Sequence, residues 1–354
     1  TLEAIADGFL RLGFSQPKTL QMLGCVAQFG NQTLHNMEAE WIIEQASSRT
    51  SFPKPMTDFG NAEFVARVFG NRIRQVVEEK TLLIYLSPIW YVDENEQHFT
   101  ELFVRAMRLA GKNALGVSDD EYRSKVLKWT RASESHQRIR AARDVIASQA
   151  GLRVSLDDLD RDPLVLGAPN GLVDLRGGTL RPGTPEELVT RQVRPEFVPG
   201  APRENWDRFL FRIMENDREM VEFLQRLTGY LITGYSTERK LFIFLGDGAN
   251  GKSTFLQILR EAFSNYAVTA QAGGLLTGGR RSPGAASSDL ARLRGRRLVV
   301  VSELEQNEHL SEAAVKNLTG GSDQIVARPL YREEIEFVPA FSIVVASNHL
   351  PTVK

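Results

Sequence analysis

The chain has 354 residues, a formal net charge of −1 and a hydrophobic fraction of 42%, values typical of globular proteins with more than one domain. Because the charge is near zero, any affinity for nucleic acid must come from local basic patches. The single cysteine excludes an internal disulfide framework and a cysteine-based zinc site. No apolar run is long enough to cross a membrane, so we expect a cytoplasmic protein without membrane contact.

The first two thirds of the chain predict an N-terminal helical segment, 1–52, and then a mainly α-helical region with small β-hairpins, 57–236. Prolines predict linkers at 52–55 and 197–202. The apolar spacing predicts, in chain order, a helix over 58–69, a hairpin of strands 81–85 and 89–92, helical structure over 99–109 and 126–147, short strands within 164–185, and helical structure over 206–233.

A strand, a glycine-rich loop and a helix follow one another over residues 240–263, KLFIFLGDGANGKSTFLQILREAF. Residues 241–245 predict a buried strand, and the loop fits G-x-x-x-x-G-K-[ST] without a gap. Glycines let successive backbone N–H groups surround a phosphate, and the helix presents its positive end to the same group. The sequence therefore predicts a site for a nucleoside triphosphate, formed by Gly246, Asp247, Gly248, Ala249, Asn250, Gly251, Lys252, Ser253 and Thr254.

Two later strands are expected to complete this site. Lys252 would reach the β- and γ-phosphates of ATP, or of another nucleoside triphosphate, and the Ser253 hydroxyl would ligate Mg²⁺. Residues 298–301 predict a buried strand that leads into Glu303 and Glu305, and such carboxylates are what Mg²⁺ and an attacking water require. A third apolar run, 341–348, ends at Asn348, which we expect to contact the γ-phosphate or the water.

Two stretches are candidates for contact with DNA. Between residues 276 and 300, a single acidic residue, Asp289, accompanies six arginines (Arg280, Arg281, Arg292, Arg294, Arg296 and Arg297). Residues 324–337 predict a hairpin around Pro329, with Arg328 and Arg332 near its tip. Ion pairing with neighbouring glutamates is the alternative interpretation of these arginines.

Four segments in this order, GDGANGKS, RLVVVSELE, KNLTGGSDQIVARPLY and SIVVASN, resemble the helicase domain of superfamily 3. The resemblance is strongest to the phage and plasmid primase-helicases related to the poxvirus primase-helicase. DPLVLGAPNGLVDLRGGTLRP and TDFGNAEFVARVFGNRI are similar to the region that precedes this domain in the family, so the resemblance extends over residues 57–354.

The resemblance implies an α/β P-loop NTPase core of the AAA+ type over residues 237–354, which binds ATP and Mg²⁺. It implies a homo-oligomeric ring, expected to be a hexamer, that moves along single-stranded DNA. By position, Lys252 and Ser253 would serve the nucleotide, Glu303 would hold Mg²⁺, and Asn348 would be sensor 1. Lys316, Arg328 and Arg332 fall in the segment that faces the central channel, and a primase or primase-polymerase domain is expected upstream.

Two departures from the family pattern bear on activity. Ser302, rather than a second acid, precedes Glu303, which leaves the division of roles between Glu303 and Glu305 open. The family's arginine finger follows the segment that ends at Asn348, and this chain ends at Lys354. The sequence thus predicts part of a longer protein that binds ATP but hydrolyses it weakly.

Two other functions fit the same motifs. One is an ATPase that remodels an origin without processive unwinding. The other is a DNA-binding and oligomerisation platform in which the nucleotide acts as a switch. The presence of Lys252, Ser253 and Glu303 together favours a motor over a switch.

Overall fold

The computed structural model describes residues 52–248, 250–272, 276–277, 287–302, 309–321, 323–330 and 333–353. They form two compact units. The first contains the described residues up to Arg161 together with Gly183–Thr190, and the second contains Asp162–Pro182 and the residues from Arg191 onwards. The predicted division at residue 237 differs from this partition, because residues 162–182 and 191–236 cluster with the glycine-rich loop. Apart from Phe52, the predicted segment 1–52 lies outside the described residues.

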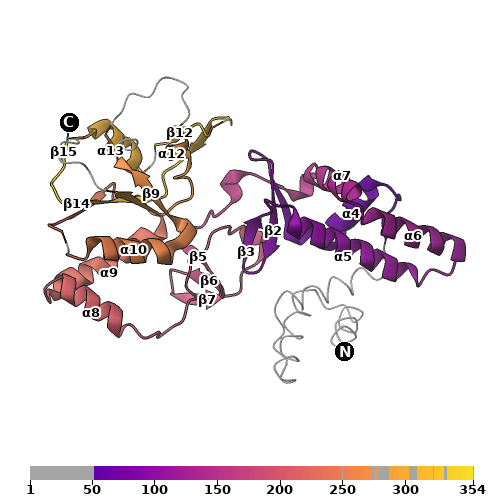
Figure 1. Cartoon of the computed structure of the whole chain (residues 1–354), viewed down its shortest axis with the longest axis horizontal. Helices are drawn as coiled ribbons and strands as arrows, with labels where there is room; N and C mark the ends of the chain where they lie inside the picture. Colours follow the sequence, from indigo (N-terminus) through magenta and orange to yellow (C-terminus); the bar gives the residue numbers. More distant parts are fainter. Residues whose placement is uncertain are drawn as a thin grey trace. The chain divides into compact units, whose positions relative to one another are not determined.

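The first unit is a four-stranded sheet covered by helices on one face (Figure 1). The sheet has the order β3-β2-β1-β4, with one parallel pair, β1 and β4. Its strands are β1 (Ile73–Val76), β2 (Thr81–Leu86), β3 (Ile89–Val92) and β4 (Arg153–Val154). The helices are α4 (Asp58–Phe69), α5 (Gln97–Ala114), α6 (Asp120–Ser133) and α7 (His136–Ala147). The predicted helix 58–69 and the predicted hairpin are confirmed.

One prediction for this unit was wrong. Residues 52–55 are not a free linker, because Phe52 is buried and its ring centroid lies 5.7 Å from that of Tyr122. The helical structure predicted over 126–147 is confirmed, and it is divided between two helices, because α6 ends at Ser133 and α7 begins at His136. Apolar spacing alone did not reveal this break, since both helices bury residues against the same core.

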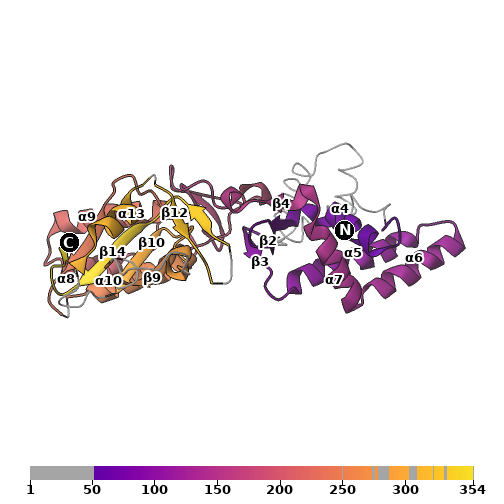
Figure 2. The same cartoon turned by 90° about the horizontal axis from the view of Figure 1, so that it is seen from above.

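The second unit is built on a parallel sheet with the order β8-β14-β10-β9 (Figure 2). The strands are β8 (Leu241–Leu245), β9 (Ala267–Gln271), β10 (Leu298–Ser302) and β14 (Ser342–Ser347). All three pairings between them are parallel. Parallel sheets are usually covered on both faces, which explains why β10 and β14 are continuous apolar runs rather than alternating ones.

Each face of this sheet has its own hydrophobic core. One core contains residues of α8 (Glu204–Ile213), α9 (Arg218–Thr233) and α10 (Lys252–Phe263). The other contains residues of α13 (Glu312–Thr319) and of the hairpin β12–β13 (Ile325–Ala327 and Ile335–Phe337), beside α12 (Ser288–Ala291). The hairpin predicted at 324–337 is therefore confirmed, with an antiparallel register that pairs Ile325 with Phe337.

The remaining strands form two small sheets. β5 (Val165–Ala168), β6 (Gly171–Asp174) and β7 (Thr179–Arg181) form an antiparallel sheet, which confirms the short strands predicted at 164–185. β11 (His309–Leu310) pairs in parallel with β15 (Thr352–Val353). In the part of the chain that the structure describes, no helix combines the length and the apolar character needed to span a bilayer.

The prediction that β8 is a buried strand was partly wrong. β8 has one neighbour in the described sheet, β14, and therefore lies at the sheet edge. Phe242 and Phe244 pack into the core shared with α10, whereas Ile243 is 38% exposed and Leu245 is 50% exposed. The sequence identified an apolar strand correctly, but apolar residues do not reveal how many neighbours a strand has.

The helical stretch predicted at 206–233 is also divided. α8 ends at Ile213, and α9 begins at Arg218 with the Asp217 carboxylate accepting a hydrogen bond from the N–H of Met220. Between the helices, Glu215 and Asn216 have φ angles of 50° and 65°. This left-handed turn lets both helices place apolar faces on the same core.

A buried arginine joins the small sheet β5-β6-β7 to the parallel sheet. Arg297, directly before β10, is 5% exposed and donates to the carbonyl groups of Ile232 and Val165, both at 2.7 Å. Its guanidinium lies 4.4 Å from the ring centroid of Tyr266. One side chain thus connects the end of α9, the start of β5 and the start of β10.

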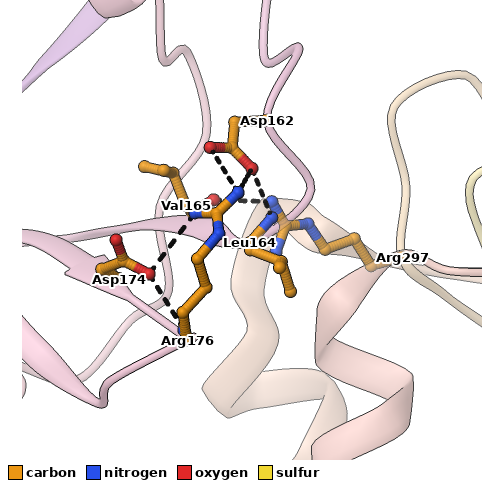
Figure 3. Close-up of polar contacts among 6 residues, drawn as sticks. All are labelled: Asp162, Leu164, Val165, Asp174, Arg176 and Arg297. Carbon is orange, nitrogen blue, oxygen red and sulfur yellow. Dashed lines mark hydrogen bonds and ion pairs between the residues drawn. The ribbon is translucent and has the colours of Figure 1, made fainter.

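Asp162 adds charge compensation near Arg297. Figure 3 shows the Asp162 carboxylate between the guanidinium groups of Arg176 and Arg297. Arg176 donates to both carboxylate oxygens, at 2.9 and 3.0 Å. This hydrogen bonding lowers the pKa of Asp162, and the charge of Arg297 acts in the same direction. Asp162 therefore stays ionised near neutral pH and offsets part of the charge beside the buried arginine.

Replacing Arg297 should destabilise the second unit. Arg297→Met removes two charged hydrogen bonds and leaves two carbonyl groups without their donor, so we expect the free energy of unfolding to fall by about 3 kcal/mol. Arg297→Lys keeps the charge but not the planar fork, so its free energy of unfolding should lie between those of Arg297→Met and the unchanged chain. Urea denaturation measures this, with the exposed Arg226→Gln as control. An Arg297→Met variant as stable as this control would contradict the assigned role.

Candidate nucleotide site

The site is assembled at the carboxyl edge of the parallel sheet. Leu245 at the end of β8 pairs with Ser347 at the end of β14, and Val301 in β10 pairs with Val345. Because all the strands are parallel, the carboxyl ends of β8, β14 and β10 lie at the same edge of the sheet. The glycine-rich loop and Asn348 are therefore neighbours, although about 100 residues separate them.

Lys252 lies at the centre of this edge. It is the first residue of α10, and its Nζ donates to the carbonyl group of Gly246, to that of Asp247 at 3.3 Å, and to Oδ1 of Asn250 at 3.0 Å. These acceptors hold the ammonium group inside the curve of the glycine-rich loop. A phosphate bound there would meet a positive charge that is already positioned.

Asn348 also reaches this lysine. Its Oδ1 accepts a hydrogen bond from Lys252 Nζ at 3.3 Å. Asn348 follows β14 directly, and it is held there by the pairing of β14 with β8. Two residues that the sequence predicted independently, from different motifs, are thus in direct contact.

The backbone at Gly251 explains why the loop needs a glycine at this position. Gly251 is the N-cap of α10 and has a φ angle of 87°. A Cβ atom there would lie 2.5 Å from Cγ2 of Ile213 in α8. The glycine also supplies no side-chain acceptor to cap α10, which suits an anion at that helix end.

Sequence reasoning missed the contribution of α8 to this site. Ile213 and Phe209 lie against Gly251, and Trp206 stacks on Phe255 of α10 with ring centroids 5.7 Å apart. Next to this stack is a cavity of about 430 Å³ between α8, α9 and α10. The amphipathic pattern of α8 indicated that one face of this helix is buried. The pattern did not identify α10 and the glycine-rich loop as the elements that cover this face.

Several predicted site residues lie outside the described residues, namely Ala249, Glu303, Glu305, Arg280, Arg281 and Arg332. Their predicted roles remain predictions. Ser253 and Thr254 occupy the first turn of α10 and are exposed. Among the described residues, no group of three or more His, Cys, Asp or Glu side chains is arranged to hold a metal ion.

The predicted DNA-binding residues Lys316 and Arg328 lie away from the loop, in elements of the opposite core. Lys316 is exposed on α13 and forms an ion pair with Glu312. A hydrogen bond from Lys316, and then its charge, lowers the pKa of that glutamate. Arg328 follows β12 and is exposed, while its backbone N–H donates to Oγ of Ser287 at 2.8 Å.

The interpretation of all six arginines as mobile DNA contacts was wrong for Arg297. This side chain is buried and hydrogen-bonded to two backbone carbonyl groups, so it is a structural residue. Arg292 is exposed and Arg296 is partly exposed, and both lie in the turn that precedes Arg297.

Two families match the chain. Residues 62–215 match the family described as "D5 N terminal like", and residues 244–354 match a family of unknown function, DUF5906. A protein of Acanthamoeba polyphaga mimivirus named as a candidate helicase is 30% identical over 203 residues, which is 56% of this chain and 21% of that protein. One of Invertebrate iridescent virus 6, also named as a candidate helicase, is 29% identical over 218 residues, 59% of this chain and 22% of that protein.

A third relative, from African swine fever virus, is named as a candidate primase and is 23% identical over 202 residues, 56% of this chain and 21% of that protein. This chain thus spans about a fifth of the length of these relatives. A solved structure titled as the apo C-terminal region of NrS-1 is similar at a TM-score of 0.45 and 12% identity, covering 82% of this chain and 57% of that one.

The fold is α/β, with a parallel sheet whose carboxyl edge brings together a lysine-bearing glycine-rich loop and a polar strand end. Residues 62–215 resemble the D5 N-terminal-like family, and the relatives named as helicases or primases come from large DNA viruses. The chain is thus similar to the D5-like primase-helicases of these viruses.

The Gly251 contact predicts a specific cost of substitution. Gly251→Ala should lower the free energy of unfolding by about 1–3 kcal/mol, since the new Cβ meets Ile213 and the backbone is left-handed. Gly248→Ala is the matched control within the same loop, because no atom lies within 4 Å of its added Cβ. The double variant Gly251→Ala/Ile213→Ala should recover only the part of the lost stability that comes from the steric clash, because the backbone strain remains. Equal stability of Gly251→Ala and Gly248→Ala by urea denaturation would refute this account.

Proposed function

We propose that this chain is the ATP-driven motor part of a superfamily 3 DNA helicase with an AAA+-type P-loop core. The observation that carries the proposal is the contact of Lys252 with both the glycine-rich loop and Asn348. A lysine between these two groups is suited to bind the terminal phosphates of a nucleotide. Because it also contacts Asn348, bound phosphates would affect the end of β14.

In this proposal the residues have distinct tasks. The loop residues Gly246 to Thr254 hold the phosphates, with Lys252 at the β- and γ-phosphates. Ser253 and Glu303 hold Mg²⁺, Glu303 or Glu305 orients the attacking water, and Asn348 contacts the γ-phosphate. Hydrolysis of bound ATP would supply the free energy for movement along DNA.

We infer that the protein acts as a homo-oligomeric ring, expected to be a hexamer, around single-stranded DNA. Lys316 and Arg328, together with Arg280, Arg281 and Arg332, would contact the phosphates of that strand. A primase or primase-polymerase domain elsewhere in the longer protein would fit the primase name of one relative.

The ATPase rate tests the nucleotide site. Lys252→Ala should reduce ATP hydrolysis by at least about 100-fold, because the charge that stabilises the transferring phosphoryl group is lost. Lys240→Ala, an exposed lysine directly before β8, is the matched control and should hydrolyse ATP normally. The rate is measured with and without single-stranded DNA. DNA-stimulated hydrolysis that survives Lys252→Ala would refute the site.

A different result would point to another function. If this chain binds ATP, and ATP alters its DNA affinity while the full-length protein shows no hydrolysis, it is a nucleotide-gated DNA-binding platform rather than a motor. Glu303→Gln distinguishes the two, because it should abolish hydrolysis in a motor while leaving ATP binding intact.

The ion pair on α13 provides a test of DNA contact. Glu312 neutralises Lys316, so Glu312→Gln should release the lysine and raise the affinity for single-stranded DNA about two- to fivefold at low salt. Lys316→Gln should lower the affinity. Fluorescence anisotropy with a labelled oligonucleotide measures both variants. If Glu312→Gln and Lys316→Gln bind equally well, α13 does not contact the DNA.

A further inference from the structure

Arg191 meets two arginines of a turn about 100 residues later in the sequence, Arg292 and Arg296, at the other edge of the parallel sheet. Arg191 and Arg296 both donate to the carbonyl group of Asn265, Arg191 at 3.2 Å. Arg296 also donates through Nε to the carbonyl group of Arg292 at 3.2 Å. We call Arg191, Arg292 and Arg296 the arginine cluster.

The chain is shaped to hold this cluster. Gly295 has a φ angle of 68°, and a Cβ atom on it would lie 2.7 Å from Nη2 of Arg191. Arg191 donates through Nη2 to the carbonyl group of Arg294 at 3.1 Å. The guanidinium of Arg191 therefore lies flat against a turn that only a glycine accommodates easily. This is a fixed arrangement and not a random gathering of surface side chains.

Like charges lie close together in the cluster. Burial, followed by the charges of Arg191 and Arg292, lowers the pKa of Arg296 to about 10. Arg296 is still fully charged at neutral pH, so the repulsion persists in the folded protein. In the part of the chain described, no carboxylate forms an ion pair with Arg292 or Arg296. An anion bound at the cluster would relieve this repulsion.

The cluster is separate from the nucleotide site. Asn265 precedes β9 and Arg296 precedes β10, so both lie at the amino edge of the sheet. The glycine-rich loop lies at the carboxyl edge, and β10 with its five residues spans about 16 Å between the edges. The terminal phosphates of a nucleotide held by Lys252 are therefore not the anion for which these arginines are arranged.

We propose that the arginine cluster is a second phosphate-binding site, which takes the phosphodiester backbone of nucleic acid outside the nucleotide site. Arginine forks match phosphate oxygens in pairs, and the cluster is open on one side because Arg292 is exposed. An extended polymer suits such an open site better than a small anion, which needs an enclosing pocket. The choice of nucleic acid rests on the DNA-binding part of the proposed function.

The test is the salt dependence of binding to a labelled single-stranded oligonucleotide by the 354-residue chain, without nucleotide. Each lost phosphate contact lowers the slope of log K against log salt by about 0.7, which is about fivefold in affinity near 0.1 M salt. We expect one such loss for Arg292→Gln and up to two for Arg292→Gln/Arg296→Gln. The control is Arg105→Gln/Arg226→Gln, which removes the same charge from exposed helix positions and should keep the slope.

The single variant Arg292→Gln should fold normally, because the Arg292 side chain makes no hydrogen bond in the described structure. A loss of DNA affinity in this variant therefore cannot be attributed to misfolding. Normal DNA affinity and slope in both cluster variants would overturn the proposal, as would a complete lack of DNA binding by the unchanged chain. If the cluster variants change the self-association of the chain but bind DNA normally, the cluster contacts an acidic surface on a second copy of the chain. That result would also overturn the proposal.

The outcome is independent of the motor. Binding of a fluorescent ATP analogue should be the same in the cluster variants and the unchanged chain. If DNA affinity falls as expected while DNA-stimulated ATP hydrolysis survives Lys252→Ala, the second phosphate site stands and the proposed nucleotide site fails. If ATP hydrolysis is DNA-stimulated yet the cluster variants bind DNA normally, the motor stands and the second site fails.

Discussion

The parallel register of β8, β14 and β10 is the constraint on which the candidate site depends. Each pairing places the end of one strand beside the end of the next, so that the residues following them meet at one edge. The contact between Lys252 and Asn348 is a direct result. Neither residue has another reason to be near the other, because they belong to segments about 100 residues apart.

A single short turn, Arg292 to Arg297, contains arginines with opposite tasks. Arg297 is buried, and its charge is matched by backbone carbonyl groups, the face of Tyr266 and the nearby Asp162. Arg296, one residue earlier, is surrounded by like charges and by a shared carbonyl group. The first arrangement is satisfied within the protein and stabilises it. The second is incomplete without an anion, and that difference separates a structural arginine from a candidate binding residue.

The matched families do not coincide with the two compact units. The family matched at 62–215 begins in the first unit and ends after α8, which packs against the glycine-rich loop of the second. Ile213 and Gly251 are in contact across what sequence comparison treats as two families. The nucleotide site is therefore not built from the C-terminal family alone, since α8 forms one side of it.

The sequence by itself determined the local elements and the chemistry of the loop. The spacing in G-x-x-x-x-G-K-S requires a particular backbone, and the apolar runs 298–301 and 341–348 predicted strands that the structure confirms as β10 and β14. Only the tertiary structure decided that β8 is an edge strand and that Arg297 is buried while Arg296 is not. Those outcomes depend on which elements become neighbours, and a pattern of residue types along one segment carries no information about its neighbours.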